Sequence, residues 1–344
     1  MTISQIPGAV RLRRNQFGVQ TALNTAVAAT RKVPWRGGVL VNQNWTDPEI
    51  DVGSLDPVAL PLAGALEVTS TKTGPVYFND LPLRLNAGLI GGITPTGAGT
   101  AKTWDYQLAS LTSDVFDVFT NQTADDTEAT DTTIGIGGLI DSLEDNHPQD
   151  LGAVTINDNW VFSTATVGSN GTDGLNVDSA AIPELAKFTT VKMDSTAGAI
   201  GTTLLSDTVH EVTISVQNNI DRKRFMNGSN GANQLGGYGR GERVIELTLV
   251  VAKTAAMVTE KNTILTAVKP SRFFDIGNFS TSEAQTGIPY SDRHRGAFRL
   301  FEVGETEIGG NVALTLTYHA YYDSTLTYAY RRTVVNTQTT VAAA

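Results

Sequence analysis

The sequence predicts a mainly β protein, and three observations support this fold class. Thr, Ser, Asn and Gly make up much of the polar composition, and these residues favour strands and turns over helices. In residues 312–319, Val312, Leu314, Leu316 and Tyr318 alternate with smaller or polar residues, which is the pattern of a half-buried strand. Helical spacing of apolar residues is persuasive in two short segments of the chain.

The same alternation predicts further strands along the chain. Trp104, Tyr106 and Leu108 fall on one side of a strand whose other side is polar. Strands are expected by the same argument near residues 66–71, 136–143, 154–162, 212–217 and 244–251, and again at Phe298, with a short apolar run at Phe273. A turn is expected over residues 305–310, before the strand at 312.

The two predicted helices each follow a capping residue. After Asp80, leucines at 81, 85 and 89 recur at helical spacing, Pro82 is tolerated in the first turn, and Gly91 and Gly92 stop the run. After Thr254, an apolar stripe ends at a proline. It consists of Met257, Ile264, Leu265 and Val268, with Pro270 as the terminator.

The length of 344 residues favours two domains, with one large β-rich domain as the alternative. Both halves show the same order of a strand, a helix, further strands and a closing hairpin, which predicts two tandem, pseudo-repeated modules. The predicted boundaries are an N-terminal arm at 1–30, a first module at 31–166, a Gly- and Ser-rich linker or excursion at 167–203, a second module at 204–336 and a C-terminal tail at 337–344.

Composition excludes several functional classes. A net charge of −10 argues against a protein that grips nucleic acid by neutralising phosphates. The absence of Cys excludes disulfides, thiolate catalysis and thiolate metal sites, and suits a reducing cytoplasm. The N-terminus lacks a signal-peptide apolar core, and no stretch approaches the about 20 apolar residues of a membrane span. We therefore expect neither secretion by this route nor a membrane location.

The sequence contains no complete motif for catalysis, cofactor binding or metal binding. Residues 97–103 lack the second Gly of a phosphate-binding loop, and the Gly-rich residues 236–241 lead into a strand instead of a helix. The acidic residues at 125, 126, 128 and 131 lack calcium-loop spacing, and the four His are scattered. No Ser occupies a Gly-x-Ser-x-Gly elbow. We predict a non-enzymatic protein with no catalytic, cofactor-binding or metal-binding residues.

Several segments together resemble the major tail tube proteins of long-tailed, siphovirus-like bacteriophages. VHEVTISVQNN at 209–219 and DRKRFMNG at 221–228 are similar to a strand of that family and its following loop. IGGNVALTLTYHAYYD at 308–323 and RTVVN at 332–336 resemble its C-terminal hairpin. Residues 77–92, 104–109 and 137–154 occupy the places of its early helix, a strand and a hairpin.

The resemblance implies a phage tail-tube fold of two packed β-sheets with short helices, whose copies assemble into a β-barrel ring. Three copies would supply six modules to a trimeric, pseudo-hexameric ring, with a hexamer of single-domain subunits as the alternative. The implied partners are other copies of the chain, a tape measure protein and tail-tip and terminator proteins. Viral DNA would pass through an acidic lumen without specific binding, in a virion tail assembled in the host bacterial cytoplasm.

Assembly contacts are expected in arms and loops that become ordered on docking. The candidates are Arg11, Arg13 and Arg14 in the arm, Arg222, Arg224, Phe225, Arg240 and Arg243 in the loop after the 209–219 strand, and Tyr328, Tyr330 and Arg332 near the C-terminus. The alternative functions are a phage capsid decoration or baseplate protein, a carbohydrate-binding or carbohydrate-processing β protein, and a surface-layer subunit or adhesin.

Overall fold

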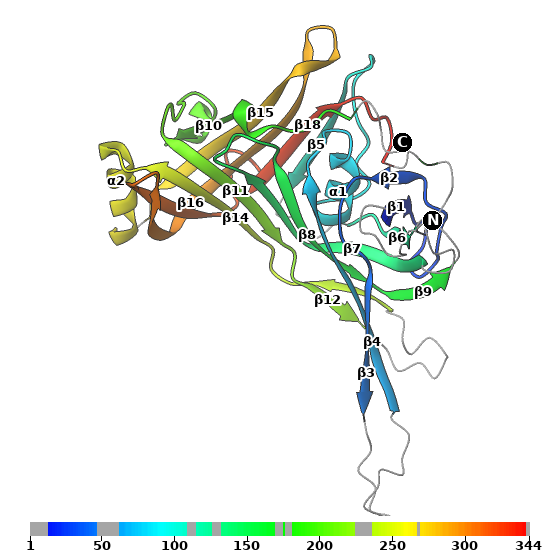
Figure 1. Cartoon of the computed structure of the whole chain (residues 1–344). Helices are drawn as coiled ribbons and strands as arrows, with labels where there is room; N and C mark the ends of the chain where they lie inside the picture. Colours follow the sequence, from blue (N-terminus) through cyan, green and yellow to red (C-terminus); the bar gives the residue numbers. More distant parts are fainter. Residues whose placement is uncertain are drawn as a thin grey trace, which may run out of the picture.

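The computed structural model describes residues 13–46, 62–108, 115–125, 132–168, 175, 181–223, 236–266 and 269–341, and it confirms a mainly β protein (Figure 1). The strands of the first half are β1 (Arg13–Val19), β2 (Arg31–Val33), β3 (Leu40–Thr46), β4 (Leu62–Pro75), β5 (Lys102–Leu108), β6 (Phe119–Asp125), β7 (Thr132–His147), β8 (Thr155–Phe162) and β9 (Thr164–Gly168). Those of the second half are β10 (Thr189–Asp194), β11 (Val209–Gln217), β12 (Ile220–Lys223), β13 (Gly237–Arg240), β14 (Val244–Ala252), β15 (Ser271–Gln285), β16 (Ile288–Ile308), β17 (Asn311–Ala320) and β18 (Tyr330–Asn336).

The described strands form one connected antiparallel sheet of 16 strands and a separate two-stranded ribbon, β12–β13. One path through this sheet runs β3–β4–β8–β7–β11–β14–β17–β16. β15 and β18 extend the sheet from β16, and β6 and β9 extend it from β7. The strands of the expected sheets are thus joined into one hydrogen-bonded network, because the long strands β7 and β16 each pair with several partners along their length.

The alternation of apolar residues located the strands well. Trp104, Tyr106 and Trp160 are fully buried, as their parity predicted. The expected turn over residues 305–310 is corrected, because β16 continues to Ile308 and the turn consists of Gly309 and Gly310. Both glycines have positive φ angles of 58° and 82°, a region that glycine adopts without steric strain.

Both predicted helices are present, as α1 (Leu81–Gly88) and α2 (Ala255–Asn262). Thr254 caps α2, since its hydroxyl accepts a hydrogen bond from the Met257 amide at 3.3 Å. Asp80 makes no such cap, because its carboxylate accepts hydrogen bonds from Arg31 instead. A 3-10 turn (Thr263–Leu265) extends α2, and two others are Ala186–Phe188 and Ala197–Ala199. No helix in the described part of the chain is long and apolar enough to cross a membrane.

One hydrophobic core draws on both halves of the chain. All eight residues of α1 are buried, between β7 and β8 on one side and β5 on the other. From this helix, Arg84 contacts Asp145 of β7 and Asp158 of β8, while Asn86 accepts a hydrogen bond from the Tyr106 hydroxyl of β5 at 2.8 Å. β5 in turn pairs with β18, so the C-terminal strand of the second half closes over the first half.

Two of the predicted segment boundaries are corrected by strand pairing. From Arg13 onward the N-terminal segment is not an arm, because β1 pairs with β6 and β2 and buries Phe17 in the core. Within the expected linker at 167–203, β10 pairs with β15, so this segment contributes a strand to the sheet. The remainder of the predicted arm, residues 1–12, lies outside the described residues.

Candidate assembly edges and polar face

The path from β3 to β16 contains the same four-stranded arrangement twice. The first unit is β3–β4–β8–β7 and the second unit is β11–β14–β17–β16. The strands of both units follow one another along the chain in the same order. In each unit the strand before the helix, β4 or β14, pairs with the last strand of the closing hairpin, β8 or β17. Strand pairing therefore follows the same order in both units.

The registers of the two units also correspond. Trp160 lies opposite Ser70 and Ile140 in the first unit. In the second unit, Tyr318 lies opposite Leu247 and Leu300 in the same way, and both aromatic side chains are fully buried. The register of each hairpin shifts immediately beyond this point, between Ile140 and Ser142 and between Leu300 and Glu302. Bulges are specific local features, so a bulge at the same place in both units supports their equivalence.

An ion pair between the helix and the first strand of the closing hairpin occurs in both units. Arg84 of α1 pairs with Asp145, which lies opposite Ile156 on β8. Lys261 of α2 pairs with Glu305 at 2.8 Å, and Glu305 lies opposite Leu314 on β17. Ile156 and Leu314 stand at the same spacing before Trp160 and Tyr318. The first pair is buried, with side chains 1% and 3% exposed, whereas the second is 32% and 47% exposed.

The two units meet inside the chain at one joint, the pairing of β7 with β11. Residues 142–147 of β7 lie there antiparallel to residues 212–217 of β11. The matching part of β16, residues 302–308, pairs with β17 along one edge, while β15 reaches β16 only as far as Arg299. β3, which matches β11, pairs with β4 alone among the described strands. The outer edges of β3 and β16 therefore correspond to the edges of β11 and β7 that pair with each other at the joint.

The side of this path that faces away from the core is polar and acidic. From β8 to β16, a row of residues lies directly opposite one another: Thr155, Asn146, Thr213, Thr248, Thr317 and Glu302. The same face carries five glutamates, Glu67, Glu144, Glu211, Glu246 and Glu302. Arg36 and Arg299 lie on the same side, as do Arg293 and Arg295 of β16, whose charges are paired with Asp275 of β15. The face therefore has a negative balance, which disfavours contact with polyanions.

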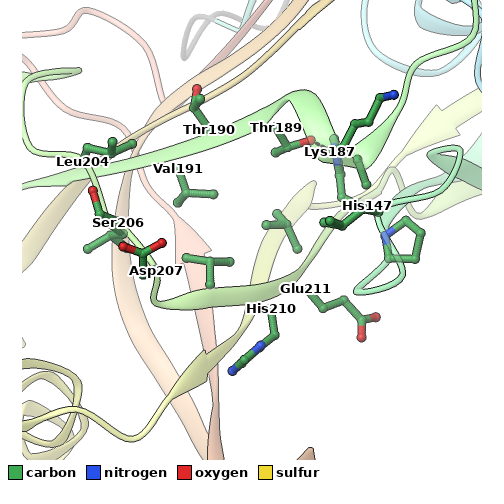
Figure 2. A pocket seen from close by; sticks show the side chains of 16 residues that line it. His147, Lys187, Thr189, Thr190, Val191, Leu204, Ser206, Asp207, His210 and Glu211 are labelled. Carbon is green, nitrogen blue, oxygen red and sulfur yellow. Dashed lines mark hydrogen bonds between the residues drawn. The ribbon is translucent and has the colours of Figure 1, made fainter.

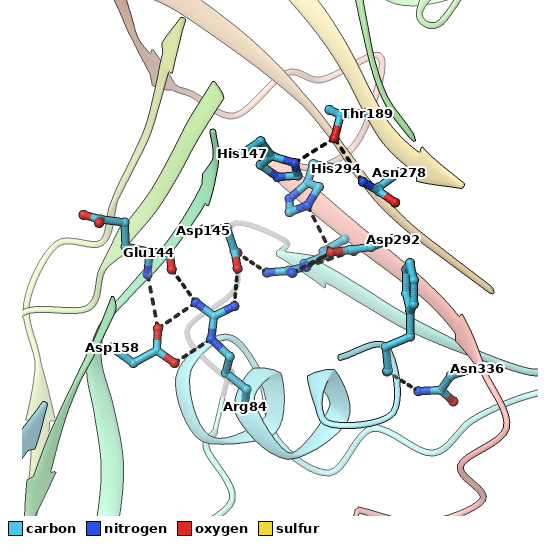
Figure 3. A network of polar contacts seen from close by, with 12 residues as sticks. Arg84, Glu144, Asp145, His147, Asp158, Thr189, Asn278, Asp292, His294 and Asn336 are labelled. Carbon is cyan, nitrogen blue, oxygen red and sulfur yellow. Dashed lines mark hydrogen bonds and ion pairs between the residues drawn. The ribbon is translucent and has the colours of Figure 1, made fainter. Parts of the chain in front are cut away.

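A buried ionic network links the first unit to the C-terminal strand (Figure 3). Arg84 and Arg332 donate to the two oxygens of the same carboxylate, Asp145, with Arg332 Nη1 at 2.6 Å from Oδ2. Arg84 Nη2 also donates to Asp158 Oδ1 at 2.6 Å, and Arg332 Nη2 donates to Asp292 Oδ2 at 2.6 Å. These side chains are at most 3% exposed, so their charges are compensated by each other and not by water.

The network fixes the charge states of its carboxylates. Burial alone would raise the pKa of Asp145, but Arg332 and Arg84 outweigh this effect and lower its pKa to about 2. In the same way, Arg332 and His294 overcome the effect of burial on Asp292 and hold its pKa well below the usual range. Burial raises the pKa of Glu184, and the nearby charge of Asp292 raises it further. Asp145 and Asp292 are thus ionised partners for the two arginines at neutral pH.

A partly open cavity of about 410 Å³ lies between β10, β11 and the segments that follow β7 and β10 (Figure 2). At its wall, the Nδ1 atom of His147 is 2.9 Å from the Thr189 hydroxyl. Burial lowers the pKa of His147 to about 4, so this imidazole is neutral at physiological pH. His210 and Glu211 point away from His147 in Figure 2. We assign no reaction to this cavity, and the described residues contain no group of three or more His, Asp or Glu placed to hold a metal ion.

The predicted contact residues near the C-terminus are corrected by their burial. Tyr328, Tyr330 and Arg332 are only 6%, 1% and 2% exposed in the free chain. The Tyr330 hydroxyl lies 2.6 Å from His294 Nδ1, and Arg332 belongs to the ionic network. The sequence shows the alternation of these residues. It does not show the carboxylates that allow Arg332 to be buried, because they lie far away in the chain. These three residues hold the fold together and are not open to a partner.

The remaining predicted contact residues are spread over several places. Arg14 lies in β1 opposite Ala124 and is half-buried, and Arg13 begins that strand. Arg243 donates to the Leu89 carbonyl at 2.9 Å, and its guanidinium lies over the Phe116 ring together with that of the exposed Arg240. Arg222 pairs with Tyr238 in the β12–β13 ribbon. Arg11, Arg224 and Phe225 lie outside the described residues.

The structure exposes apolar residues that sequence reasoning did not select for the assembly site. Leu40 and Val41 on β3 are 67% and 49% exposed, and Phe301 at the bulge of β16 is 55% exposed. The chain matches no protein-family model and no curated protein, so its function is argued from its own residues.

Proposed function

We propose that this chain is the structural subunit of a bacteriophage tail tube, which polymerises into stacked rings that form the conduit for DNA ejection. The observation that carries the proposal is the repeated unit: a joint between two units is made inside the chain, and the two edges needed for the same joint have no strand partner among the described residues. Repetition of one interface from copy to copy generates a ring when the rotation closes.

Ring closure also accounts for the open edges. An exposed edge strand normally invites uncontrolled pairing, and closure into a barrel removes it. With two units in each chain, three copies place six equivalent units around one axis. Tape measure, tail-tip and terminator proteins are the further partners that a tail tube of this kind requires. The resemblance of residues 209–228 and 308–336 to tail tube proteins supports this reading.

The polar face is the surface that we assign to the lumen. Its rows of Thr, Asn and Glu give the sheet a side with little apolar area, while the other side packs on the core. DNA carries about one negative charge per 1.7 Å of helix axis, so glutamates along the wall reduce adhesion during passage. The net charge of −10 is in keeping with a conduit that does not bind its cargo.

Electron microscopy of the purified protein tests the proposed function. We expect negatively stained samples to show hollow tubes of uniform bore built from stacked rings. A protein that remains monomeric at high concentration, with and without added tail-tip components as nucleators, contradicts the proposal.

A charge reversal tests the lumen assignment. The double variant Glu144→Lys with Glu246→Lys should still form tubes but should retain duplex DNA at low salt, since two cations per chain now face the bore. The matched control, Glu144→Gln with Glu246→Gln, removes the same carboxylates without adding cations and should retain far less. Equal retention of DNA by both variants, measured by co-sedimentation, would place these glutamates outside the lumen.

A further inference from the structure

The joint inside the chain shows which residues meet when two units pair. Leu143 of β7 lies opposite Val216 of β11, and the two side chains are 2% and 4% exposed. Just beyond them, the Asn218 amide donates to the Asp141 carbonyl at 2.8 Å. Because directly opposite residues of an antiparallel pair exchange hydrogen bonds at every second position, Leu143 and Val216 form a hydrogen-bonded pair as well.

The counterparts of these two residues stand on the open edges. Val303 of β16 lies opposite Leu316. It is the third residue after Leu300, where the register shifts, as Leu143 is the third residue after Ile140 in β7. Val41 of β3 lies opposite Val68, as Val216 lies opposite Ile245 in the second unit. Val41 is 49% exposed and Val303 is partly exposed, so an apolar pair that is buried at the joint is open to solvent at the ends.

The backbone of β3 is oriented for a partner on its open side. Arg36 and Thr73 exchange two hydrogen bonds, at 2.7 and 3.1 Å, so alternate residues from Arg36 onward direct their backbone groups toward β4. Val39 and Val41 are on the other parity, and their N–H and C=O groups point away from β4. At Gly37 the carbonyl is occupied, since it accepts a hydrogen bond from Lys72 Nζ at 2.7 Å. The open edge therefore begins at Val39.

We propose that the second half of β16 in one copy pairs antiparallel with β3 of a second copy, in the register that places Val303 opposite Val41. This inference rests on the proposed function and specifies its interface. The register is that of β7 with β11, transferred through the equivalence of the two units. It sets Glu302 opposite Asn42 and Gly304 opposite Leu40, and it covers the exposed Lys261–Glu305 ion pair as Arg84–Asp145 is covered inside the chain.

Cysteine cross-linking tests this register directly, because the chain contains no Cys of its own. Asn42 and Glu302 are both exposed, and in the proposed register they form a non-hydrogen-bonded pair with Cα atoms about 4.5 Å apart, which is within disulfide range. Oxidised tubes of the double variant Asn42→Cys with Glu302→Cys should shift from the monomer band to dimer and covalent trimer bands in non-reducing gels. A mixture of the two single variants should stop at dimers.

The matched control is Asn42→Cys with Thr306→Cys, which places the second thiol four residues along the same strand and outside disulfide range. It should form tubes and remain monomeric in the gel. Tubes that cross-link in the control, or in neither variant, would overturn the register while leaving the proposed function standing. Failure of the wild-type protein to form tubes would remove the proposed function and this interface together.

Discussion

The first unit and the second unit share a strand order and a register, yet they bury different kinds of side chain at equivalent positions. In the first unit, Lys72 lies opposite Asp158, and both side chains are fully buried. In the second unit, Leu249 lies opposite Leu316 at the same positions, and both are equally buried. Backbone pairing and one central aromatic residue therefore suffice to keep the arrangement, while the core chemistry is free to differ.

The difference follows from what packs over each unit. Additional strands cover the first unit and bring polar partners with them, such as Asn15 of β1, which accepts a hydrogen bond from Lys72 Nζ at 2.6 Å. Arg332 of β18 donates a hydrogen bond to Asp145 at 2.6 Å. On the second unit, the corresponding helix and strand remain open, as the 47% exposure of Glu305 shows. The exposed positions of the second unit are thus where a neighbouring copy is expected to supply cover.

The largest expected contrast is between the two equivalent ion pairs. Arg84→Ala leaves Asp158 and Asp145 with one cation fewer in a dry interior, and we expect it to lower the free energy of unfolding by about 3–5 kcal/mol. Lys261→Ala at the exposed counterpart should cost less than about 1 kcal/mol. Denaturant unfolding of the unassembled subunit measures both, and similar losses would mean that the second pair is not a solvent-exposed copy of the first.

The next contrast compares two valines at equivalent positions. Val216→Ala removes buried methyl groups at the joint and should lower the free energy of unfolding by about 2 kcal/mol. Val41→Ala should change the stability of the free subunit by less than about 0.5 kcal/mol, because half of the side chain is already in water.

In tube assembly, by contrast, we expect a substitution at Val41 to have the larger effect. Val41→Asp is expected to leave the subunit folded by circular dichroism but to abolish tubes in electron micrographs, since it places a charge in the proposed interface. Normal tubes from Val41→Asp would show that β3 is not an assembly edge.

A smaller effect should appear in the pH dependence of stability. Burial lowers the pKa of Lys72 to about 7 from its usual 10.5, so the folded state loses this proton before the unfolded state does. Stability from this group is therefore absent below about pH 7 and returns as the pH rises toward 10.5. Lys72→Met should remove about 1.4 kcal/mol per pH unit from the slope of stability between about pH 7.5 and 9.5. Parallel curves for wild type and variant would indicate a solvated lysine.

The sequence contained enough information for the strands and for the order of the repeat. Alternation located β5, β8, β11, β14 and β17 because each buries one face in a regular way. It missed β1, where Asn15 and Gln16 are buried beside Phe17 and the Asn15 side chain forms hydrogen bonds with Trp35 and Lys72, which are distant in sequence. Local pattern cannot show such partners.

The assembly site was harder to predict for a related reason. Tyr330 and Arg332 have the residue types of a contact surface, yet Asp292 and His294 turn them into interior groups. The edges of β3 and β16 became recognisable only after pairing was known, because an open edge is defined by the absence of a neighbouring strand. The two predicted helices, by contrast, depend on local signals and were located correctly.

The cross-section of assembled tubes tests the central claim most directly, namely that the joint inside the chain is repeated between chains. Averaged end-on views or a helical reconstruction should show six similar lobes per ring, alternating in detail so that the true symmetry is threefold, with mass per ring equal to three chains. A ring whose lobes correspond one to one with whole chains, or a map in which β16 and β3 of neighbouring copies do not meet, would contradict this account.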